Sequence, residues 1–400
     1  MQLGCPMADA LIVTTYEDRP AAMQGVELLA RSLTRHNPGL RLTVWSPLDR
    51  AAVTGLTADE VDWRLSPELA GLGWSVKPTI LLRALDEAPR AMWIDSDVIV
   101  VGPIGAAIGG NETELVVGQE FRDSGHAGSI ARVHAWGWTL ARLLPFHLNS
   151  GTVVASRWHE GLLKIWQSLL TSDVYLDAQK IQPVTSRPVH VLGDQDVLWS
   201  LLCAEFWFIK LRFLRNGVDV VQDCGANGFH VLDRLRNLRS TRVMFVHALG
   251  KNKPWHFDDP AAAGIGYMRW ATYEVSPYFS AAQAYARYLP RARWLVRRNP
   301  LAIALSAASG RGFARAGFSL AVVALATAVA AATSRRLRSL MRSADGGALR
   351  VAQPETSTEV PVTPALMDPR PWPGDRGAVL VEPLPADGTV EQRRRRARAA

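Results

Sequence analysis

Cysteine is scarce in this chain of 400 residues, which contains Cys5, Cys203 and Cys224 and no others. An odd number of cysteines without a C-x-x-C spacing argues against a disulfide framework and against a zinc site. The start of the sequence also lacks a basic region followed by a long apolar stretch, the pattern of a secretory signal peptide. These absences favour a reducing compartment. Met7 is a candidate start, because a strand-like segment follows it directly.

Acidic residues are missing from one part of the chain. Between residues 275 and 344 there are eleven arginines, no lysine and neither Asp nor Glu. The formal net charge of +8 therefore belongs to this segment, and residues 1–274 are slightly acidic. This distribution indicates an anionic surface as the partner of the C-terminal segment and does not suggest a nucleic-acid-binding core.

Strand-like and helix-like segments alternate at the start of the chain. Residues 10–15 and 40–45 are apolar and strand-like, and residues 21–36 between them have apolar positions at helical spacing. A strand, helix and strand in this order predict a parallel sheet, in which ligands bind beyond the carboxyl ends of the strands. Tyr16 lies at such a place after the first strand, although a tyrosine in a polar turn equally fits simple packing.

An apolar stretch with two carboxylates, residues 91–101, is the most informative part of the sequence. Its Val and Ile residues predict a strand buried on both faces, with Asp95 and Asp97 in its middle. Residues two apart on an extended chain point to the same side, so the two carboxylates can offer oxygen ligands to one divalent metal. The alternative is a turn in which one aspartate caps the next element.

Lys77 precedes this stretch at the expected start of a helix that runs to about residue 85. Ser75 is the expected N-cap, and Pro78 suits the first turn. Lys77 would then stand at the positive end of the helix, where phosphate is favoured. A solvated surface lysine is the alternative.

Further polar motifs follow in the second half of the chain. Asn149 and Gly151 precede a β-branched run, and Gly151 allows close approach of a ligand to the backbone. Asp194 and Gln195 open a helix, where they can line the same pocket, although Asp194 also fits an N-cap. Residues 118–147, rich in Gly, Trp and His, are expected to be irregular and to border a substrate cleft.

The last of these motifs contains a histidine, a glycine and a lysine. His247 ends a strand-like segment, Gly250 marks a turn, and Lys253 follows it. A histidine at this place can supply a nitrogen ligand to a metal, and the lysine can bind phosphate.

Taken in order, these motifs resemble glycosyltransferase family 8, which includes the glycogenins and bacterial lipopolysaccharide galactosyltransferases. The shared segments are residues 94–100, 149–151, 193–196 and, most specific, the H-x-x-G-x-x-K-P-W pattern of residues 247–255. The resemblance covers roughly residues 8–260. It implies an α/β GT-A fold, with a mostly parallel sheet flanked by helices, in a catalytic domain of residues 8–275.

The resemblance also implies a role for each site residue. Asp95, Asp97 and His247 are the implied ligands of Mn²⁺ or Mg²⁺, and Asp95 would also contact the ribose. Tyr16 would contact the uracil of the nucleotide sugar. Lys77 and Lys253 would bind the diphosphate, with Gly250 in the same motif as Lys253. The implied contacts to the sugar are Asn149, Asp194 and Gln195. Among these, Asp194, Gln195 and Lys253 are the expected catalytic residues.

The function that follows is transfer of a hexose with retention at the anomeric carbon. The expected donor is UDP-glucose or UDP-galactose, and the acceptor is a glycan, a lipid-linked group or another hydroxyl. We expect a same-face mechanism in which the leaving phosphate helps to deprotonate the acceptor. The alternatives are a sugar-nucleotide-binding protein without turnover and a membrane scaffold.

The C-terminal third is expected to associate with the cytoplasmic face of a membrane. Residues 280–342 are basic and apolar, and residues 316–334 are uncharged and long enough either to span a bilayer or to lie flat on it. A buried or oligomer-forming helix is the alternative for that run. Residues 345–400 are rich in Pro with Glu, Thr and Arg, and are expected to be disordered.

Overall fold

The computed structural model describes residues 11–53, 55–109, 111–120, 125–223, 243–250, 253–256, 267–309 and 378–381. The uncharged run 316–334 lies outside the described residues, as does the tail 345–400 apart from residues 378–381. Among the helices that are described, none has the length and apolar character needed to cross a membrane.

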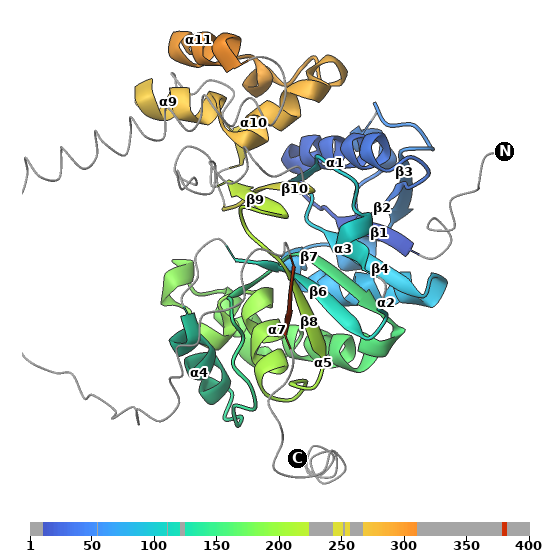
Figure 1. Cartoon of the computed structure of the whole chain (residues 1–400). Coiled ribbons are helices and arrows are strands. Elements are labelled where there is room, and N and C mark those ends of the chain that lie inside the picture. Colours follow the sequence, from blue (N-terminus) through green and yellow to red (C-terminus); the bar gives the residue numbers. More distant parts are fainter. Residues whose placement is uncertain are drawn as a thin grey trace, which may run out of the picture.

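A mostly parallel sheet of eight strands forms the centre of the molecule (Figure 1). In order across the sheet the strands are β11 (Ala378–Val381), β8 (Lys210–Leu214), β6 (Glu114–Gln119), β7 (Leu148–Ser156), β4 (Arg90–Ile94), β1 (Leu11–Tyr16), β2 (Leu42–Ser46) and β3 (Val61–Leu65). Strand β7 runs antiparallel to both of its neighbours, and β11 runs antiparallel to β8. The remaining neighbours are parallel.

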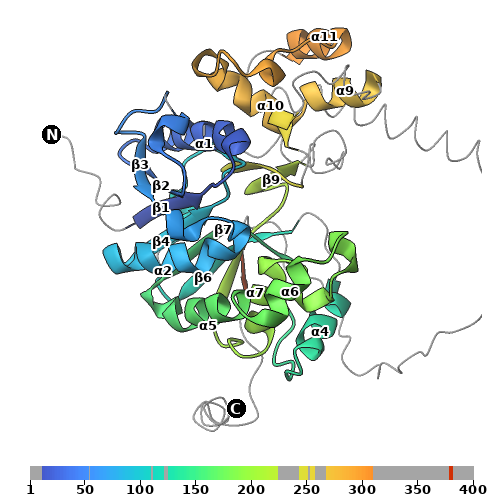
Figure 2. The ribbon, with the colours of Figure 1, turned by 180° about the vertical axis from the view of Figure 1, so that it is seen from behind.

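Helices cover both faces of this sheet. The described helices are α1 (Met23–His36), α2 (Lys77–Glu87), α3 (Gly105–Ile108), α4 (Gly125–Ala135), α5 (Glu160–Leu170), α6 (Asp173–Gln179), α7 (Asp194–Cys203), α9 (Tyr267–Glu274), α10 (Pro277–Ala282) and α11 (Pro300–Ser309). Figure 2 shows α2, α5 and α7 next to one another on one face of the sheet. The predicted α/β class is confirmed, and the arrangement is consistent with a GT-A-like fold.

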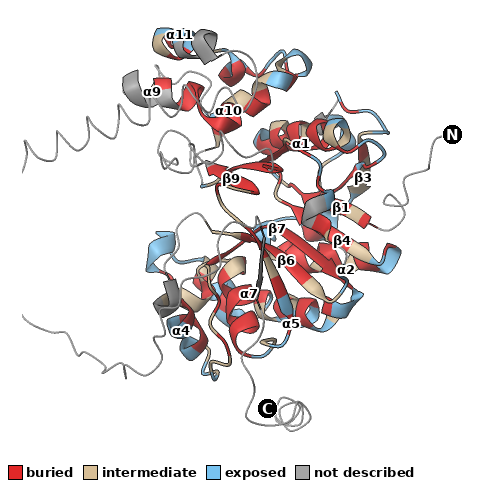
Figure 3. Ribbon diagram, viewed as in Figure 1, coloured by how far each residue is buried: buried red, intermediate tan, exposed pale blue. Residues whose placement is uncertain are grey.

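Alternation along β4 explains how the sheet is buried on both faces. Ala91 and Trp93 belong to the hydrophobic core under α2, α5 and α7, whereas Met92 and Ile94 belong to the core under α1. Successive side chains of a strand point to opposite faces, so an uninterrupted apolar run satisfies both cores. The inner strands β1, β2, β4, β6 and β7 are accordingly mostly buried, whereas the edge strand β3 is only partly buried (Figure 3).

A second, three-stranded sheet corrects the prediction for residues 91–101. Instead of one strand, this stretch forms β4 in the large sheet and β5 (Val98–Val100) in a small sheet with β10 (Phe245–Ala248) and β9 (Val220–Asp223). Asp95, Ser96 and Asp97 form the turn between them, and the amide of Val98 donates to the carbonyl of Asp95 at 3.1 Å. The two carboxylates thus lie where the chain passes from one sheet to the other.

Helices α9 to α11 form a layer against the small sheet (Figure 1). Their core contains Trp255, Tyr278 and Trp294, which pack with residues of β5, β9 and β10. The indole nitrogen of Trp294 also donates to the side-chain oxygen of Gln24 in α1 at 2.8 Å. The start of the predicted membrane-associating segment, up to Leu295, is therefore packed on the α/β domain.

Three smaller predictions also need correction or comment. Helix α4 lies within residues 118–147, which were expected to be irregular. Helix α2 has Val76 at its N-cap position, and Ser75 lies in the preceding 3-10 turn, so Ser75 is not the cap. Strand β11 lies within the tail that was expected to be disordered; for the rest of the tail that expectation stays a prediction.

Candidate active site

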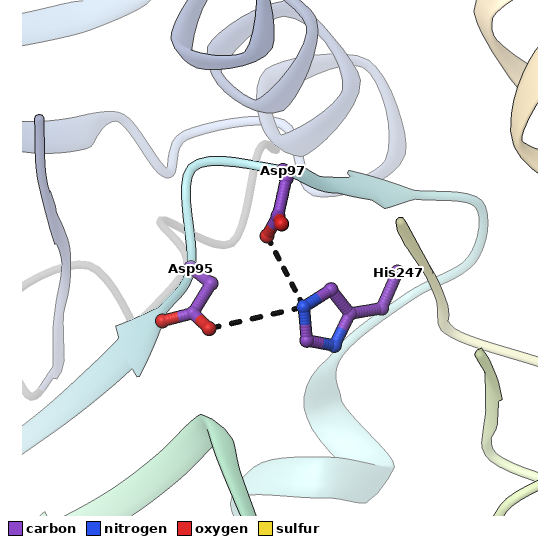
Figure 4. Close-up of side chains that lie close together, drawn as sticks. All are labelled: Asp95, Asp97 and His247. Atoms are coloured by element: carbon purple, nitrogen blue, oxygen red, sulfur yellow. Dashed lines mark ion pairs between the residues drawn. The ribbon is translucent and has the colours of Figure 1, made fainter. Parts of the chain in front are cut away.

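Asp95, Asp97 and His247 lie together at the end of β4 (Figure 4). The Nε2 atom of His247 is 3.1 Å from Oδ1 of Asp97 and 3.8 Å from Oδ2 of Asp95. One potential ligand atom from each of the three side chains falls within 4.8 Å of the others. The structure thus brings together all three predicted metal ligands, although they were not expected to come from two sheets.

Backbone pairing produces this geometry. Strand β10 runs antiparallel to β5 and places His247 opposite Val98, the residue after Asp97. The amide of Asp95 donates to the carbonyl of Gly151 in β7 at 2.9 Å. A Cβ atom on Gly151 would lie 2.5 Å from Cε1 of His247 and 3.0 Å from Oδ2 of Asp95, so only glycine leaves room for both side chains.

The donor set and its surroundings fit a divalent cation. Oδ1 of Asp95 accepts from the indole nitrogen of Trp93 at 2.7 Å, while Oδ2 is the oxygen turned toward His247. Oδ1 of Asp97 is buried and faces the imidazole of His247, another potential metal ligand. Two carboxylates and an imidazole suit Mn²⁺, which accepts both oxygen and nitrogen ligands.

Lys253 is the cation of this cluster. Its ammonium contacts Oδ2 of Asp97 and donates to the carbonyl of Ala248 at 2.8 Å. Burial acts to raise the pKa of the Asp97 carboxyl, but Lys253 and His247 more than offset it and hold this pKa well below its usual range. Asp97 is therefore ionised at neutral pH, as metal ligation requires. Gly250, in the turn before Lys253, has a φ of 84°, which favours glycine.

A second cationic group lies on the other side of Asp95. The ammonium of Lys77 is 3.1 Å from Oδ1 of Asp95 and 3.2 Å from Oδ2 of Asp194. It also donates to Oγ of Ser150 at 2.9 Å, and that hydroxyl donates to Asp194 at 2.6 Å. Burial acts to lower the pKa of Lys77, but Asp194 and Asp95 raise it above its ordinary value. Lys77 is thus a buried, charged residue of the site and not a solvated surface lysine.

This network also decides the role of Asp194 within the fold. Gly193, not Asp194, occupies the N-cap position of α7, and the side chain of Asp194 is directed to Lys77 and Ser150. The alternative reading of Asp194 as an N-cap is therefore wrong.

Glu120 is a site residue that the sequence analysis missed. Its Oε2 atom accepts from the amide nitrogens of Asn149 and Gln195, each at 3.0 Å. These are two of the residues expected to contact the donor sugar. Glu120 directly follows β6, which is parallel to β4 because both are antiparallel to β7. The rule that ligands lie beyond the carboxyl ends of parallel strands would have found it.

Tyr16 lies apart from this polar cluster. It is 6% exposed and belongs to the main hydrophobic core, and its hydroxyl donates to the carbonyl of Leu69 at 2.6 Å. Its predicted contact with uracil is not tested by this placement and stays a prediction.

Comparisons with known proteins point to transferases. No protein-family model matches the chain. The lipopolysaccharide 1,3-galactosyltransferase of Salmonella typhimurium is 24% identical over 206 residues, 50% of this chain and 50% of that protein. The chain therefore spans about half the length of this curated relative. Among solved structures, the apo form of the WbbM bifunctional glycosyltransferase matches with a TM-score of 0.40 and 12% identity, over 63% of this chain and 48% of that one.

Both of these proteins are named as glycosyltransferases, and the name of the Salmonella protein agrees with the predicted enzyme class. Neither name specifies family 8, so that finer assignment stays a prediction. The cluster of Asp95, Asp97 and His247 is the feature of this chain that fits such chemistry best.

Proposed function

We propose that the protein is a metal-dependent, retaining glycosyltransferase of the family 8 type, which moves a hexose from UDP-glucose or UDP-galactose to a glycan or a lipid-linked acceptor. The observation that carries the proposal is the cluster of Asp95, Asp97 and His247 with Lys77 and Lys253 beside it. The galactosyltransferase name of the curated relative supports the same class of substrate.

The residues of the cluster divide the work of binding the donor. Asp95, Asp97 and His247 would hold Mn²⁺ or Mg²⁺, which when bound stabilises negative charge on the diphosphate. Lys253 lies against Asp97 and can move its ammonium to the leaving diphosphate, where charge grows in the transition state. Lys77 fixes Asp95 and Asp194 in position through two ion pairs.

Retention calls for a covalent intermediate or for departure and attack on one face of the sugar. Of the acidic and amide groups near the expected sugar site, Asp194 already binds Lys77 and Ser150, and Gln195 is neutral. The carboxylate of Glu120 already accepts from the side-chain amides of Asn149 and Gln195. A covalent intermediate needs a carboxylate that is available as nucleophile. We therefore favour the same-face route, in which the leaving phosphate takes the acceptor proton.

The proposed location is the cytoplasmic face of a membrane. Arg287, Arg291, Arg293 and Arg298 are exposed, and between residues 275 and 309 the chain has no acidic residue. Three large apolar side chains of the same segment are also exposed: Tyr288, Val296 and Ile303. Basic and apolar groups on one surface segment suit anionic lipid headgroups.

The test is a screen of sugar nucleotides with Mn²⁺ and acceptor glycans, measuring released UDP. We expect UDP release by the full chain and its loss in Asp97→Asn, which keeps the size of the side chain but removes the charge. Asp177→Asn is the matched control, because Asp177 is an exposed aspartate paired with Lys180. Equal UDP release by Asp97→Asn and the unmodified protein would contradict the metal site, and no release with any donor would favour the binding or scaffold alternatives.

A further inference from the structure

A buried glutamate joins the first strand to the aspartate turn. Glu17, which directly follows β1, has a side chain only 1% exposed. Its Oε2 accepts from Oγ of Ser96 at 2.7 Å, and Ser96 is the residue between Asp95 and Asp97. Because β1 and β4 are parallel neighbours, the segments after them lie at the same edge of the sheet.

Glu17 fixes the orientation of the Arg19 guanidinium. Its Nε donates to Oε1 of Glu17 at 2.7 Å and its NH2 to Oε2 at 2.8 Å, a bidentate pair that fixes the plane of the guanidinium. The Arg19 side chain is nevertheless 61% exposed. Within the part of the chain that the structure describes, its NH1 atom has no hydrogen bond or ion pair.

The electrostatics of the pair make a phosphate a poor ligand for Arg19. The carboxylate of Glu17 neutralises the guanidinium, and two of its three nitrogens are already engaged. The cations beside the metal site are Lys77 and Lys253, on the Asp95 and Asp97 sides of the turn. A neutralised, rigid, exposed plane instead suits stacking on a flat heterocycle.

Arg19 lies close to the aspartate turn but outside the set of metal ligands. With the diphosphate at Asp95 and Asp97, the base is displaced by the length of a ribose. The carboxylate of Glu17 binds both Arg19 and Ser96, so Arg19 lies near the turn without touching the metal ligands. Tyr16, three residues earlier, is 6% exposed, and its hydroxyl lies near the carbonyl of Leu69 and the carboxylate of Asp18, so Arg19 offers the larger exposed surface.

We propose that the exposed face of the Arg19 guanidinium stacks on the base of the donor nucleoside diphosphate, with Glu17 as the residue that positions it. This inference rests on the proposed function, because it assumes a sugar nucleotide as donor. It assigns to Arg19 the contact with the base that the sequence suggested for Tyr16.

The experiment is isothermal titration of the full chain, in Mn²⁺, with UDP and separately with inorganic pyrophosphate, which has no base. Arg19→Ala should weaken UDP binding roughly tenfold, because the flat surface on which the base stacks is lost. Pyrophosphate binding should not change. Arg19→Tyr, which retains a flat surface, should keep most of the UDP affinity, whereas Arg19→Lys, which retains the charge, should not.

Two controls keep the readout specific. Arg64→Ala removes another arginine held by carboxylates, those of Asp62 and Glu87, on the edge strand β3, and should leave UDP binding unchanged. Electron paramagnetic resonance of bound Mn²⁺ should be the same in Arg19→Ala and the unmodified protein. If Arg19→Ala does not fold, the Arg19→Lys and Arg19→Tyr variants still separate charge from planarity.

The outcomes separate failure of the inference from failure of the proposed function. Unchanged UDP affinity in Arg19→Ala would overturn the stacking role, while the function would stand. Equal losses for UDP and pyrophosphate, restored by Arg19→Lys, would identify a phosphate contact and also overturn it. If the unmodified protein bound no UDP, the proposed function itself would fail, and the inference with it.

Discussion

His247 and Asp97 meet at 3.1 Å because β10 pairs with β5 in a register that sets His247 opposite Val98. Strand pairing thus places His247, and Asp95 and Asp97 lie in a three-residue turn held between β4 and β5. Sites that are held by regular elements are more rigid than sites on loops. We therefore expect the geometry to be sensitive to small changes in the strands around it.

Gly151→Ala tests that sensitivity. The added Cβ would meet Cε1 of His247 at 2.5 Å, so the imidazole has to move and the affinity for Mn²⁺ should fall about tenfold or more, as for other changes that misplace a ligand. Gly105→Ala is the matched control, because nothing lies within 4 Å of the position of its Cβ. Mn²⁺ titration followed by paramagnetic resonance measures the effect, and equal affinities in the two variants would contradict the crowding argument.

Lys253→Ala should lower kcat far more than it raises KM. The ammonium acts on charge that grows as the diphosphate leaves, and loss of one such group costs on the order of 100-fold in kcat. Lys180→Ala, at an exposed lysine, is the control. Steady-state kinetics of UDP release decide the matter: a rise in KM at constant kcat would make Lys253 a ground-state phosphate contact only.

His159 should make stability depend on pH. Burial lowers its pKa to about 4, and its Nδ1 accepts from the amide of Ser156 at 3.0 Å, which requires the neutral ring. Between pH 6.5 and 4 the unfolded chain binds more protons at this histidine, so the free energy of unfolding falls as pH falls, by up to about 3 kcal/mol.

Urea unfolding at pH 7 and pH 4.5 measures this contribution. In His159→Gln the difference between the two pH values should be smaller than in the unmodified protein. Comparing the two proteins cancels the pH dependence that the other titratable groups contribute to the free energy of unfolding. One of these is Asp196: burial raises its pKa to about 6, and its contribution has the opposite sign. An identical pH dependence in both proteins would show that His159 does not contribute.

Membrane association should depend on the exposed arginines. Replacing Arg291 and Arg293 by Ser should weaken binding to anionic vesicles, with roughly 1 kcal/mol lost for each charge near the surface. Cosedimentation with phosphatidylglycerol vesicles measures binding, and neutral phosphatidylcholine vesicles serve as the control for charge.

Cell fractionation is a second test of this location. We expect the full chain with the membranes. A truncation after Ser309 should be retained less, since it keeps helices α9 to α11 but loses residues 310–400, which include the edge strand β11. Truncation at residue 280 would remove Trp294 from the core and would test folding instead. Recovery of the full chain in the soluble fraction at low salt would contradict the proposal.

Residue type and spacing predicted many of the site residues, but not which segments of the chain lie next to one another in the fold. Asp95 and Asp97 were identifiable as two carboxylates two residues apart in an apolar run, and His247 as a histidine at the end of a strand-like segment. The division of residues 91–101 between two sheets was not, because an apolar run shows burial and does not show which strand it pairs with. The pairing of Glu120 with Gln195 was missed for a related reason, since hydrogen bonds between distant segments leave no periodic pattern.

Tyr16 and Arg19 illustrate the same limit at the level of side-chain direction. Both lie at the carboxyl end of the first strand, and the sequence favoured the aromatic residue. In the fold the tyrosine turns into the core and the arginine remains on the surface. A strand that is buried on both faces gives no sequence signal for the direction in which its last residue points.

The aspartate turn also has a consequence for how the molecule holds together. Asp95 directly follows β4 of the large sheet, Asp97 directly precedes β5 of the small sheet, and His247 lies in β10 of the small sheet. A cation ligated by all three would link the two sheets, and its binding free energy would stabilise their packing against each other. Removing metal with a chelator should then loosen the small sheet and the helices α9 to α11 before the large sheet, so that protease cuts first in the C-terminal layer.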